Sequence, residues 1–206
     1  MKNNVTERII GITGGVACGK STAASILADQ LSVEHVDTDR TAKQLLEEDP
    51  AIRVAVKAKI SPRAYRADGK LDREWLRNAA FSDPSVRERL NAIVHPSVRT
   101  EWTAKVNQCR MGKVGLLVEI PLLYEVNAAE FFDEVVVVGA SPATQIDRLT
   151  KVRGLSELIA RKILASQMNL SDKVKRASRV LWNDSDLATF KRQADYLSAI
   201  LLKTSV

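Results

Sequence analysis

A nine-residue segment near the N-terminus constrains the fold of this chain more than any other feature. It matches the pattern G-x-x-x-x-G-K-[ST] and consists of Gly14, Gly15, Val16, Ala17, Cys18, Gly19, Lys20, Ser21 and Thr22. A short apolar, β-branched run at 8–13 precedes it, and apolar residues with helical spacing follow over 21–31. A strand, a glycine loop and a helix in this order are the context in which the pattern binds phosphate. The alternative is an ordinary glycine turn between a strand and a helix.

The residue types of this loop suit a nucleoside triphosphate. Wrapping phosphates requires several backbone N–H groups to point inward, which glycine allows at low cost. The start of a helix adds a positive dipole end and further N–H groups. Lys20 would place a charge on the β- and γ-phosphates, and the hydroxyl of Ser21 would bind Mg²⁺. The loop therefore predicts ATP as co-substrate and Mg²⁺ as the metal.

Strand and helix patterns alternate beyond the loop, which is typical of a parallel α/β sheet. We expect five strands, at 8–13, 33–37, 114–120, 134–139 and 179–182. Helices are expected at 41–60 with a break near Pro50, and at 72–81, 82–94, 96–110, 144–151, 155–168 and 187–201. The prediction is a three-layer α/β fold with a five-stranded parallel sheet in one domain over 1–206. A helical insertion at about 41–112 and a small lid at about 148–176 complete it.

Charge and composition narrow the class of partner. The chain has 206 residues and a net charge of +6, and the segment 148–179 alone holds nine basic residues against two acidic ones. Such a segment is typical of a phosphate-gripping lid, of a nucleic-acid surface or of a solvated helix face. It contains no aromatic residue, which argues against a stacking platform for single strands. We therefore expect no nucleic-acid partner.

Two observations favour a cytoplasmic location. The two cysteines, Cys18 and Cys109, form neither a disulfide framework nor a metal site. Met1–Glu7 is polar and shows no signal peptide, and no apolar run approaches the ~20 residues of a membrane span. We expect no membrane partner, and a monomer or a small homo-oligomer. Because a helix N-terminus lowers the pKa of a thiol, Cys18 is either a reactive thiol whose alkylation blocks ATP or a tolerated variable position.

Three acidic residues stand where α/β sheets bind their ligands, at the carboxyl ends of predicted strands. Asp39 would accept or orient the proton of an attacking hydroxyl, or it would cap the helix that follows. Asp37 is either structural or a remote member of the Mg²⁺ shell, and Glu119 either holds Mg²⁺ through water or is a strand-end glutamate. His95, ahead of Pro96, is expected at the opening of a helix as a surface or capping residue.

Taken together, these motifs resemble those of the dephospho-coenzyme A kinase family. The resemblance runs from about Ile9 to Asn183 and rests on the phosphate loop, on Val36–Asp39, on Leu-Asn-Ala-Ile-Val-His-Pro at 90–96, on Pro-Leu-Leu-Tyr-Glu at 121–125, on Gln145, Arg148 and Arg153, and on Ser166–Met168 with Lys173. Very many proteins share the phosphate loop. The segments at 90–96 and 121–125 together are specific to this family.

The resemblance implies a P-loop NTPase fold and ATP- and Mg²⁺-dependent phosphorylation of the ribose 3′-hydroxyl of dephospho-coenzyme A. By position, Asp39 matches the family's acceptor-side acid, and Arg148 and Arg153 match its lid arginines. With Lys20 these are the predicted catalytic residues. The predicted acceptor-binding residues are Asp39, Lys43, His95, Pro121, Leu122 and Leu123. From the residues alone, the segment 121–125 is either core or a wall of the acceptor pocket.

Three positions depart from the family's pattern. Ala17 stands where a loop glycine is usual, and Lys43 replaces an arginine and cannot make its bidentate contact with phosphate. The segment 177–183 lacks the family's acid, and the glycine that usually follows is absent at Asp184–Ser185. This end of the chain helps to form the adenine site in the family.

Two other functions fit the same loop. A different small-molecule kinase, such as a nucleoside monophosphate kinase, would have a similar loop, acid and lid arginines. The second is an ATP-driven protein switch. A switch driven by GTP would need an N-K-x-D run to select the base, and the sequence has none.

Overall fold

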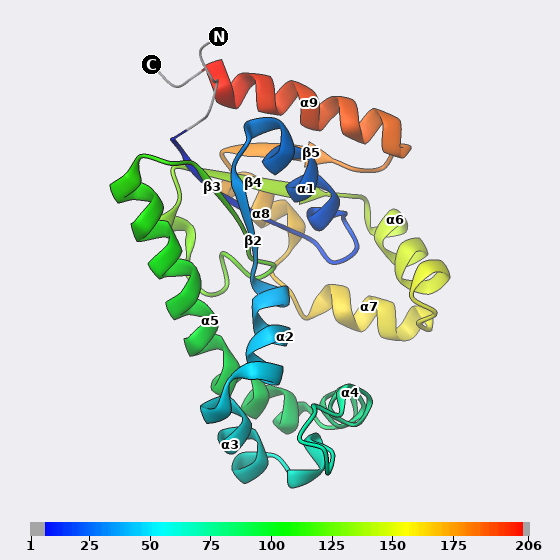
Figure 1. Ribbon diagram of the computed structural model, residues 1–206. Helices are drawn as coiled ribbons and strands as arrows, with labels where there is room; N and C mark the ends of the chain where they lie inside the picture. The colour runs from blue at the N-terminus through cyan, green and yellow to red at the C-terminus, as the bar shows by residue number, and fades with distance from the viewer. Residues whose placement is uncertain (1–6, 204–206) are drawn as a thin grey trace. The chain divides into compact units, whose positions relative to one another are not determined.

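The computed structural model describes residues 7–203, so the polar stretch at Met1–Glu7 falls almost wholly outside the described residues. Five strands form one sheet in the order β2-β3-β1-β4-β5 (Figure 1). They are β1 (Ile9–Gly14), β2 (Glu34–Asp37), β3 (Leu116–Glu119), β4 (Glu134–Gly139) and β5 (Arg179–Trp182). Every neighbouring pair is parallel. The predicted five-stranded parallel sheet is thereby confirmed.

Helices occupy most of the remaining described chain. They are α1 (Lys20–Leu31), α2 (Thr38–Glu48), α3 (Pro50–Lys59), α4 (Arg73–Ser82), α5 (Pro84–Gly112), α6 (Pro142–Asp147), α7 (Glu157–Ala165), α8 (Leu170–Arg176) and α9 (Leu187–Lys203). Short 3₁₀ turns lie at Pro62–Ala64 and Ala129–Phe131, and a π-helical stretch lies at Arg148–Val152. The predicted N-cap of α7 is confirmed, because the Ser156 side chain accepts a hydrogen bond from the N–H of Ile159.

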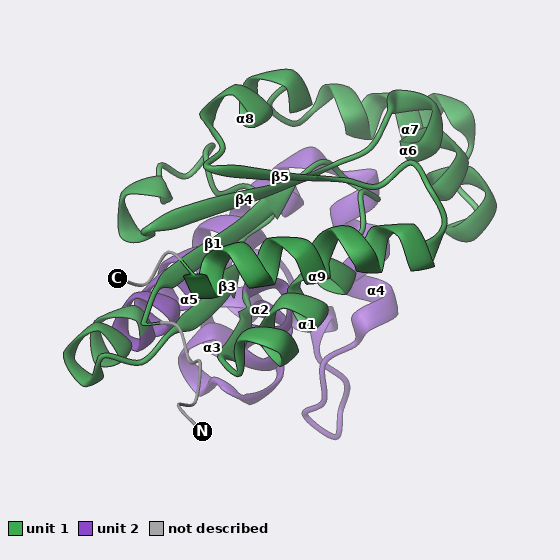
Figure 2. Cartoon of the chain, turned by 90° about the horizontal axis from the view of Figure 1, so that it is seen from above, with its two compact units in different colours: residues 1–37, 106–206 green, residues 38–105 purple. Residues whose placement is uncertain are grey.

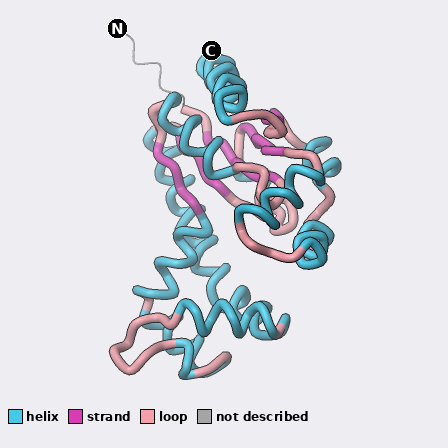
Figure 3. Tube along the Cα trace, turned by 90° about the vertical axis from the view of Figure 1, so that its right-hand side faces the viewer, coloured by secondary structure: helices cyan, strands magenta, loops and turns pink. Residues whose placement is uncertain are grey.

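The chain divides into two compact units, and the boundaries fall directly after β2 and within α5 (Figure 2). Unit 1 comprises residues 1–37 and 106–206, and unit 2 comprises residues 38–105. Unit 1 contains the whole sheet. Unit 2 is built of helices (Figure 3).

Unit 1 has three layers. In Figure 2, α1 and α9 lie on one side of the sheet and α8 lies on the other. Ile10 and Ile12 of β1 are fully buried and pack in one cluster with Leu27 of α1 and Leu201 of α9. Side chains alternate across a strand, so Gly11 faces the opposite layer, where a Cβ would meet Phe132 and Leu123. Burial on both faces explains why these strands are continuously apolar.

Two predictions about unit 2 are wrong. Helix α5 runs unbroken through Pro96, so His95 lies inside a helix rather than at its start. A proline inside a helix removes one N–H donor and crowds the preceding turn. Here Val94, Val98 and Trp102 form a buried stripe with a spacing of four residues across the proline, and this packing offsets the cost.

The second error concerns the start of α2. This helix begins at Thr38, directly after β2, and not at Thr41. Asp39 is therefore the second residue of the helix and not its N-cap. A carboxylate in the first turn still interacts favourably with the helix dipole, but the capping alternative for Asp39 no longer holds.

None of the described helices is both long enough and apolar enough to cross a membrane.

Candidate nucleotide-binding site

The predicted phosphate loop joins the end of β1 to the start of α1. Gly14 has φ +152° and Gly19 has φ +88°, a backbone region that other residues rarely adopt. A Cβ at Gly14 would collide with the carbonyl of Val138 on β4, and one at Gly19 would collide with the Asn183 side chain. No side chain caps the first turn of α1, and that turn holds no acidic residue. The helix therefore presents its N–H groups and positive dipole end at the loop.

Ala17 keeps the loop conformation that a glycine would adopt more easily. Its φ is +58°, a left-handed value that costs a residue with a Cβ roughly 1–2 kcal/mol. Two hydrogen bonds hold this part of the loop: Arg148 Nη1 donates to the Ala17 carbonyl (3.1 Å), and Asn183 Nδ2 donates to the Cys18 carbonyl (2.9 Å). Alanine in place of the family's glycine therefore adds backbone strain at this position.

The Cys18 thiol does not have the character of a reactive group. Its side chain is fully buried in the core. Burial raises the pKa of the thiol, and the nearby charges of Lys20 and Arg148 lower it by less. A buried thiol with a raised pKa is a poor nucleophile. The structure therefore argues against the alternative in which Cys18 is a reactive thiol.

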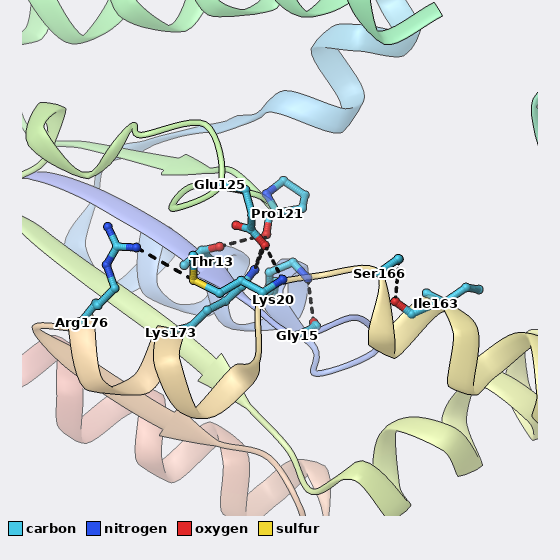
Figure 4. Close-up of polar contacts among 10 residues, drawn as sticks. Thr13, Gly15, Lys20, Pro121, Glu125, Ile163, Ser166, Lys173 and Arg176 are labelled. Carbon is cyan, nitrogen blue, oxygen red and sulfur yellow. Dashed lines mark hydrogen bonds and ion pairs between the residues drawn. The ribbon is translucent and has the colours of Figure 1, made fainter. Parts of the chain in front are cut away.

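Lys20 and Ser21 lie at the start of α1. Lys20 Nζ donates to the Gly15 carbonyl (2.9 Å), so the side chain folds back along the loop (Figure 4). The Ser21 hydroxyl donates to Oε1 of Glu119 (2.9 Å), the last residue of β3. Burial raises the pKa of Glu119, but its contacts with His35 and Ser21 outweigh this effect and hold the pKa below its usual value. Glu119 is therefore a carboxylate beside the Ser21 hydroxyl.

Ser21 and Glu119 are suited to bind a Mg²⁺ ion that arrives with a nucleotide. No cluster of three or more His, Cys, Asp or Glu side chains among the described residues would hold a metal by itself. Mg²⁺ in kinase sites needs no such cluster, because phosphate oxygens and water supply most of its ligands. The hydroxyl of Ser21 and the carboxylate of Glu119 are the hard oxygen donors that this ion prefers.

The Arg148 side chain is hydrogen-bonded to the backbone of the phosphate loop. It lies in the π-helical stretch after α6. Besides its bond to Ala17, its Nη2 donates to the Asn183 carbonyl (2.9 Å). Arg153 directly follows this stretch and is exposed, and Gly154 comes next with φ +66°. The structure thus brings one of the two predicted lid arginines to the loop and leaves the other at the surface.

A buried charged cluster lies at the far end of the predicted lid (Figure 4). Lys173 of α8 is fully buried, and its Nζ lies 2.8 Å from Glu125 Oε1 and 3.2 Å from the Pro121 carbonyl. The same carbonyl accepts a hydrogen bond from the Thr13 hydroxyl (3.0 Å). Glu125 Oε1 also accepts from the N–H of Met168 (3.1 Å). These contacts connect α8, the loop after β3 and the end of β1.

Sequence reasoning gave this cluster no role. Glu125 and Lys173 each lie in a segment that carries the family resemblance, which was the available signal, but 48 positions separate them in the chain. In the same loop Leu123 is fully buried and packs toward β1, so its side chain belongs to the core. Pro121 and Leu122 are half-buried.

The other predicted acceptor residues lie in unit 2. Asp39 and Lys43 are exposed and lie one helical turn apart on α2, on the same side of that helix. His95 is exposed in the middle of α5.

A cavity of about 450 Å³ adjoins the loop within unit 1. Gly15 forms part of its wall, and the rest comes from α6, α7 and residues 167–170. The segment 157–170, inside the predicted lid, therefore borders an open cavity next to the phosphate loop.

A glycine loop between the first strand of a parallel sheet and a helix, with a serine–carboxylate pair at its end, defines a P-loop nucleotide-binding protein. The model of the dephospho-CoA kinase family matches residues 8–189. The chain belongs to this family.

A named relative supports this assignment, and two solved structures share the fold. A dephospho-CoA kinase of Thermosynechococcus vestitus is 37% identical over 192 residues, which cover 93% of this chain and 94% of that protein. A solved protein structure from Thermus thermophilus is 30% identical with a TM-score of 0.74, and the match covers 98% of this chain and all of that one (100%). The dephospho-CoA kinase from Campylobacter jejuni shares the fold, with a TM-score of 0.65 at 23% identity over 95% of this chain and 98% of that one.

Proposed function

We propose that this protein transfers the γ-phosphoryl group of ATP to the ribose 3′-hydroxyl of dephospho-coenzyme A, giving coenzyme A and ADP. The family match over residues 8–189 carries this proposal. The intact phosphate loop and the Ser21–Glu119 pair support it, because they provide what binding of a Mg²⁺-nucleotide requires.

In this proposal, different residues of the loop bind the phosphates of ATP and the Mg²⁺ ion. The backbone of residues 14–22 surrounds the phosphates, and Lys20 exchanges the Gly15 carbonyl for a phosphate oxygen. Ser21 and Glu119 would hold Mg²⁺, which neutralises charge that develops on the phosphates. Arg148 keeps the carbonyls of Ala17 and Asn183 in place and so fixes the loop against the C-terminal end of the sheet.

Asp39 is proposed to orient or deprotonate the 3′-hydroxyl, by its match to the family's acceptor-side acid. Lys43 and His95 are proposed acceptor contacts, together with Pro121 and Leu122. Arg153, at the surface after the π-helical stretch, is proposed to close on the transferring phosphoryl group when both substrates are bound.

The wider assignments follow from the same function. We propose that residues of about 41–112 form the acceptor-binding insertion and that about 148–176 form a lid within one kinase domain. A cytoplasmic enzyme that acts as a monomer or a small homo-oligomer, with no nucleic-acid partner, fits this role.

Coupled measurement of ADP release over a panel of acceptors tests the proposal. The panel contains dephospho-coenzyme A, AMP, other nucleoside monophosphates and shikimate, with Lys20→Ala as the inactive control. Release that depends on dephospho-coenzyme A and is lost in the control supports the proposal. Faster turnover with a nucleoside monophosphate would favour the rival small-molecule kinase, and release without any acceptor would favour an ATP-driven switch.

A further inference from the structure

His35 lies outside the phosphate loop and has no role in the mechanism proposed above. It lies on β2, the edge strand beside β3. Its Nε2 lies 3.3 Å from Oε2 of Glu119. The register pairs Asp37 with Glu119 and His35 with Leu117, so the side chains of His35 and Glu119 emerge on the same face of the sheet.

The Glu119 carboxylate is therefore contacted at both oxygens by side chains from different elements. The Ser21 hydroxyl of α1 bonds Oε1, and the His35 imidazole of β2 approaches Oε2. The Glu119 side chain is only 4% exposed, whereas that of His35 is 21% exposed. The Ser21 hydrogen bond holds Oε1, whereas the imidazole lies at ion-pair distance from Oε2 without completing a hydrogen bond to it. Turning this buried carboxylate away would lose both contacts, so the two neighbours together restrict its orientation.

This orientation matters for the hydroxyl of Ser21. A serine hydroxyl has one hydrogen and two lone pairs. When the hydrogen is donated to Glu119, the lone pairs are directed elsewhere and are available to a cation. If the carboxylate turned away, the hydroxyl could rotate and donate its hydrogen to a phosphate oxygen instead. Fixing Glu119 thus fixes Ser21 as an acceptor.

We propose that His35 is a positioning residue for the magnesium site: it holds Glu119 in the orientation that keeps the Ser21 lone pairs directed at the metal. The inference rests on the ATP- and Mg²⁺-binding part of the proposed function and not on the identity of the acceptor. Partners of metal-binding groups in other proteins act in this way, and their loss typically reduces metal affinity or activity about 10- to 100-fold.

The residue type at position 35 supports a positioning role for His35. An aliphatic β-branched residue would suit a half-buried strand position at least as well as histidine. Among the described residues, Glu119 provides the polar contact of the imidazole.

Calorimetric titration of ADP with Mg²⁺ and with EDTA measures the proposed role without catalysis. The ratio of the two dissociation constants reports how much the metal tightens nucleotide binding. We expect His35→Val to leave the EDTA value within about twofold and to reduce the Mg²⁺-dependent tightening on the order of tenfold. His35→Gln, which keeps a side-chain N–H donor, should recover part of the tightening. Glu34→Gln is the matched control, because Glu34 is the exposed neighbour on the same strand.

A double variant tests whether His35 acts through Glu119. In a Glu119→Gln background, His35→Val should have little further effect on the Mg²⁺-dependent tightening. Three results would overturn the proposal: unchanged tightening in His35→Val, an equal loss of affinity with Mg²⁺ and with EDTA, or fully independent effects in the double variant. Thermal unfolding of each variant shows whether it is folded, and His35→Gln carries the test if His35→Val is not. Because no acceptor is present, failure of the dephospho-coenzyme A assay would leave this result unaffected.

Discussion

Replacing Lys173 by methionine should destabilise the protein by about 3 kcal/mol. Lys173 is fully buried, and its ammonium group pairs with Glu125 at 2.8 Å. Removing one member of a buried pair typically costs about 3–5 kcal/mol, because the other charge is left uncompensated. The Glu125 side chain is 22% exposed. Water can therefore solvate part of the remaining charge, and the lower end of that range applies. Methionine retains most of the buried apolar stem.

Thermal unfolding followed by circular dichroism is the assay. For a protein of this size, a loss of 3 kcal/mol corresponds to a decrease in Tm of about 6–12 °C. Lys175→Met is the matched control on the same helix, because the Lys175 side chain is 75% exposed and its pair with Asp172 is at the surface. Exposed pairs contribute at most about 1 kcal/mol.

The double variant Lys173→Met with Glu125→Gln adds a second check. It removes the unpaired charge, so it should be more stable than Lys173→Met alone by about 1–2 kcal/mol. Equal stability of Lys173→Met and Lys175→Met, or a double variant less stable than Lys173→Met, would show that the buried pair does not stabilise the protein in this way.

Four further predictions concern the site. Lys20→Ala should keep the circular dichroism spectrum and lose nearly all turnover, because the lysine charge serves the phosphates and not the core; a loss in kcat of less than about tenfold would contradict this. Asp39→Asn should lower kcat more than it raises the KM for ATP, and a pure increase in that KM would place Asp39 with the metal instead. Arg153→Lys keeps the charge but loses the planar fork, so it should lower kcat strongly with little change in the KM for dephospho-coenzyme A; near-normal kcat would make Arg153 part of a solvated basic face. Cys18 should resist iodoacetamide in the folded protein, because the thiol is buried and its pKa is raised; rapid labelling, measured by mass spectrometry of the peptide that contains it, would show that the loop opens.

Features that depend on neighbouring residues in the chain were predictable from the sequence. The phosphate loop is specified by its glycines, by Lys20 and by the apolar runs on either side. The strand at 134–139 holds four consecutive valines between Glu134 and Gly139. This strand and the last one, at 179–182, both have the predicted bounds. β-branched residues favour strands over short helices.

Features that depend on distant residues were not predictable in the same way. In the sequence, Pro96 predicts a break in the helix. The reason that α5 continues is the buried stripe on both sides of the proline, which only the structure shows. In the sequence, Lys173 is one of nine basic residues in the segment 148–179 and nothing sets it apart from the others. In the structure it is fully buried. The contact of His35 with Glu119 depends on the pairing of β2 with β3, across 84 positions of the chain.

Phosphorus NMR of the product shows directly whether the phosphoryl group is transferred to the ribose 3′-hydroxyl. The protein is incubated with ATP, Mg²⁺ and dephospho-coenzyme A, and the product is separated and its spectrum recorded. We expect one new phosphomonoester resonance, coupled to the proton on the 3′ carbon of the ribose, in an amount equal to the ADP released. ADP release without a new monoester, or a monoester on a different hydroxyl, would contradict the proposed function.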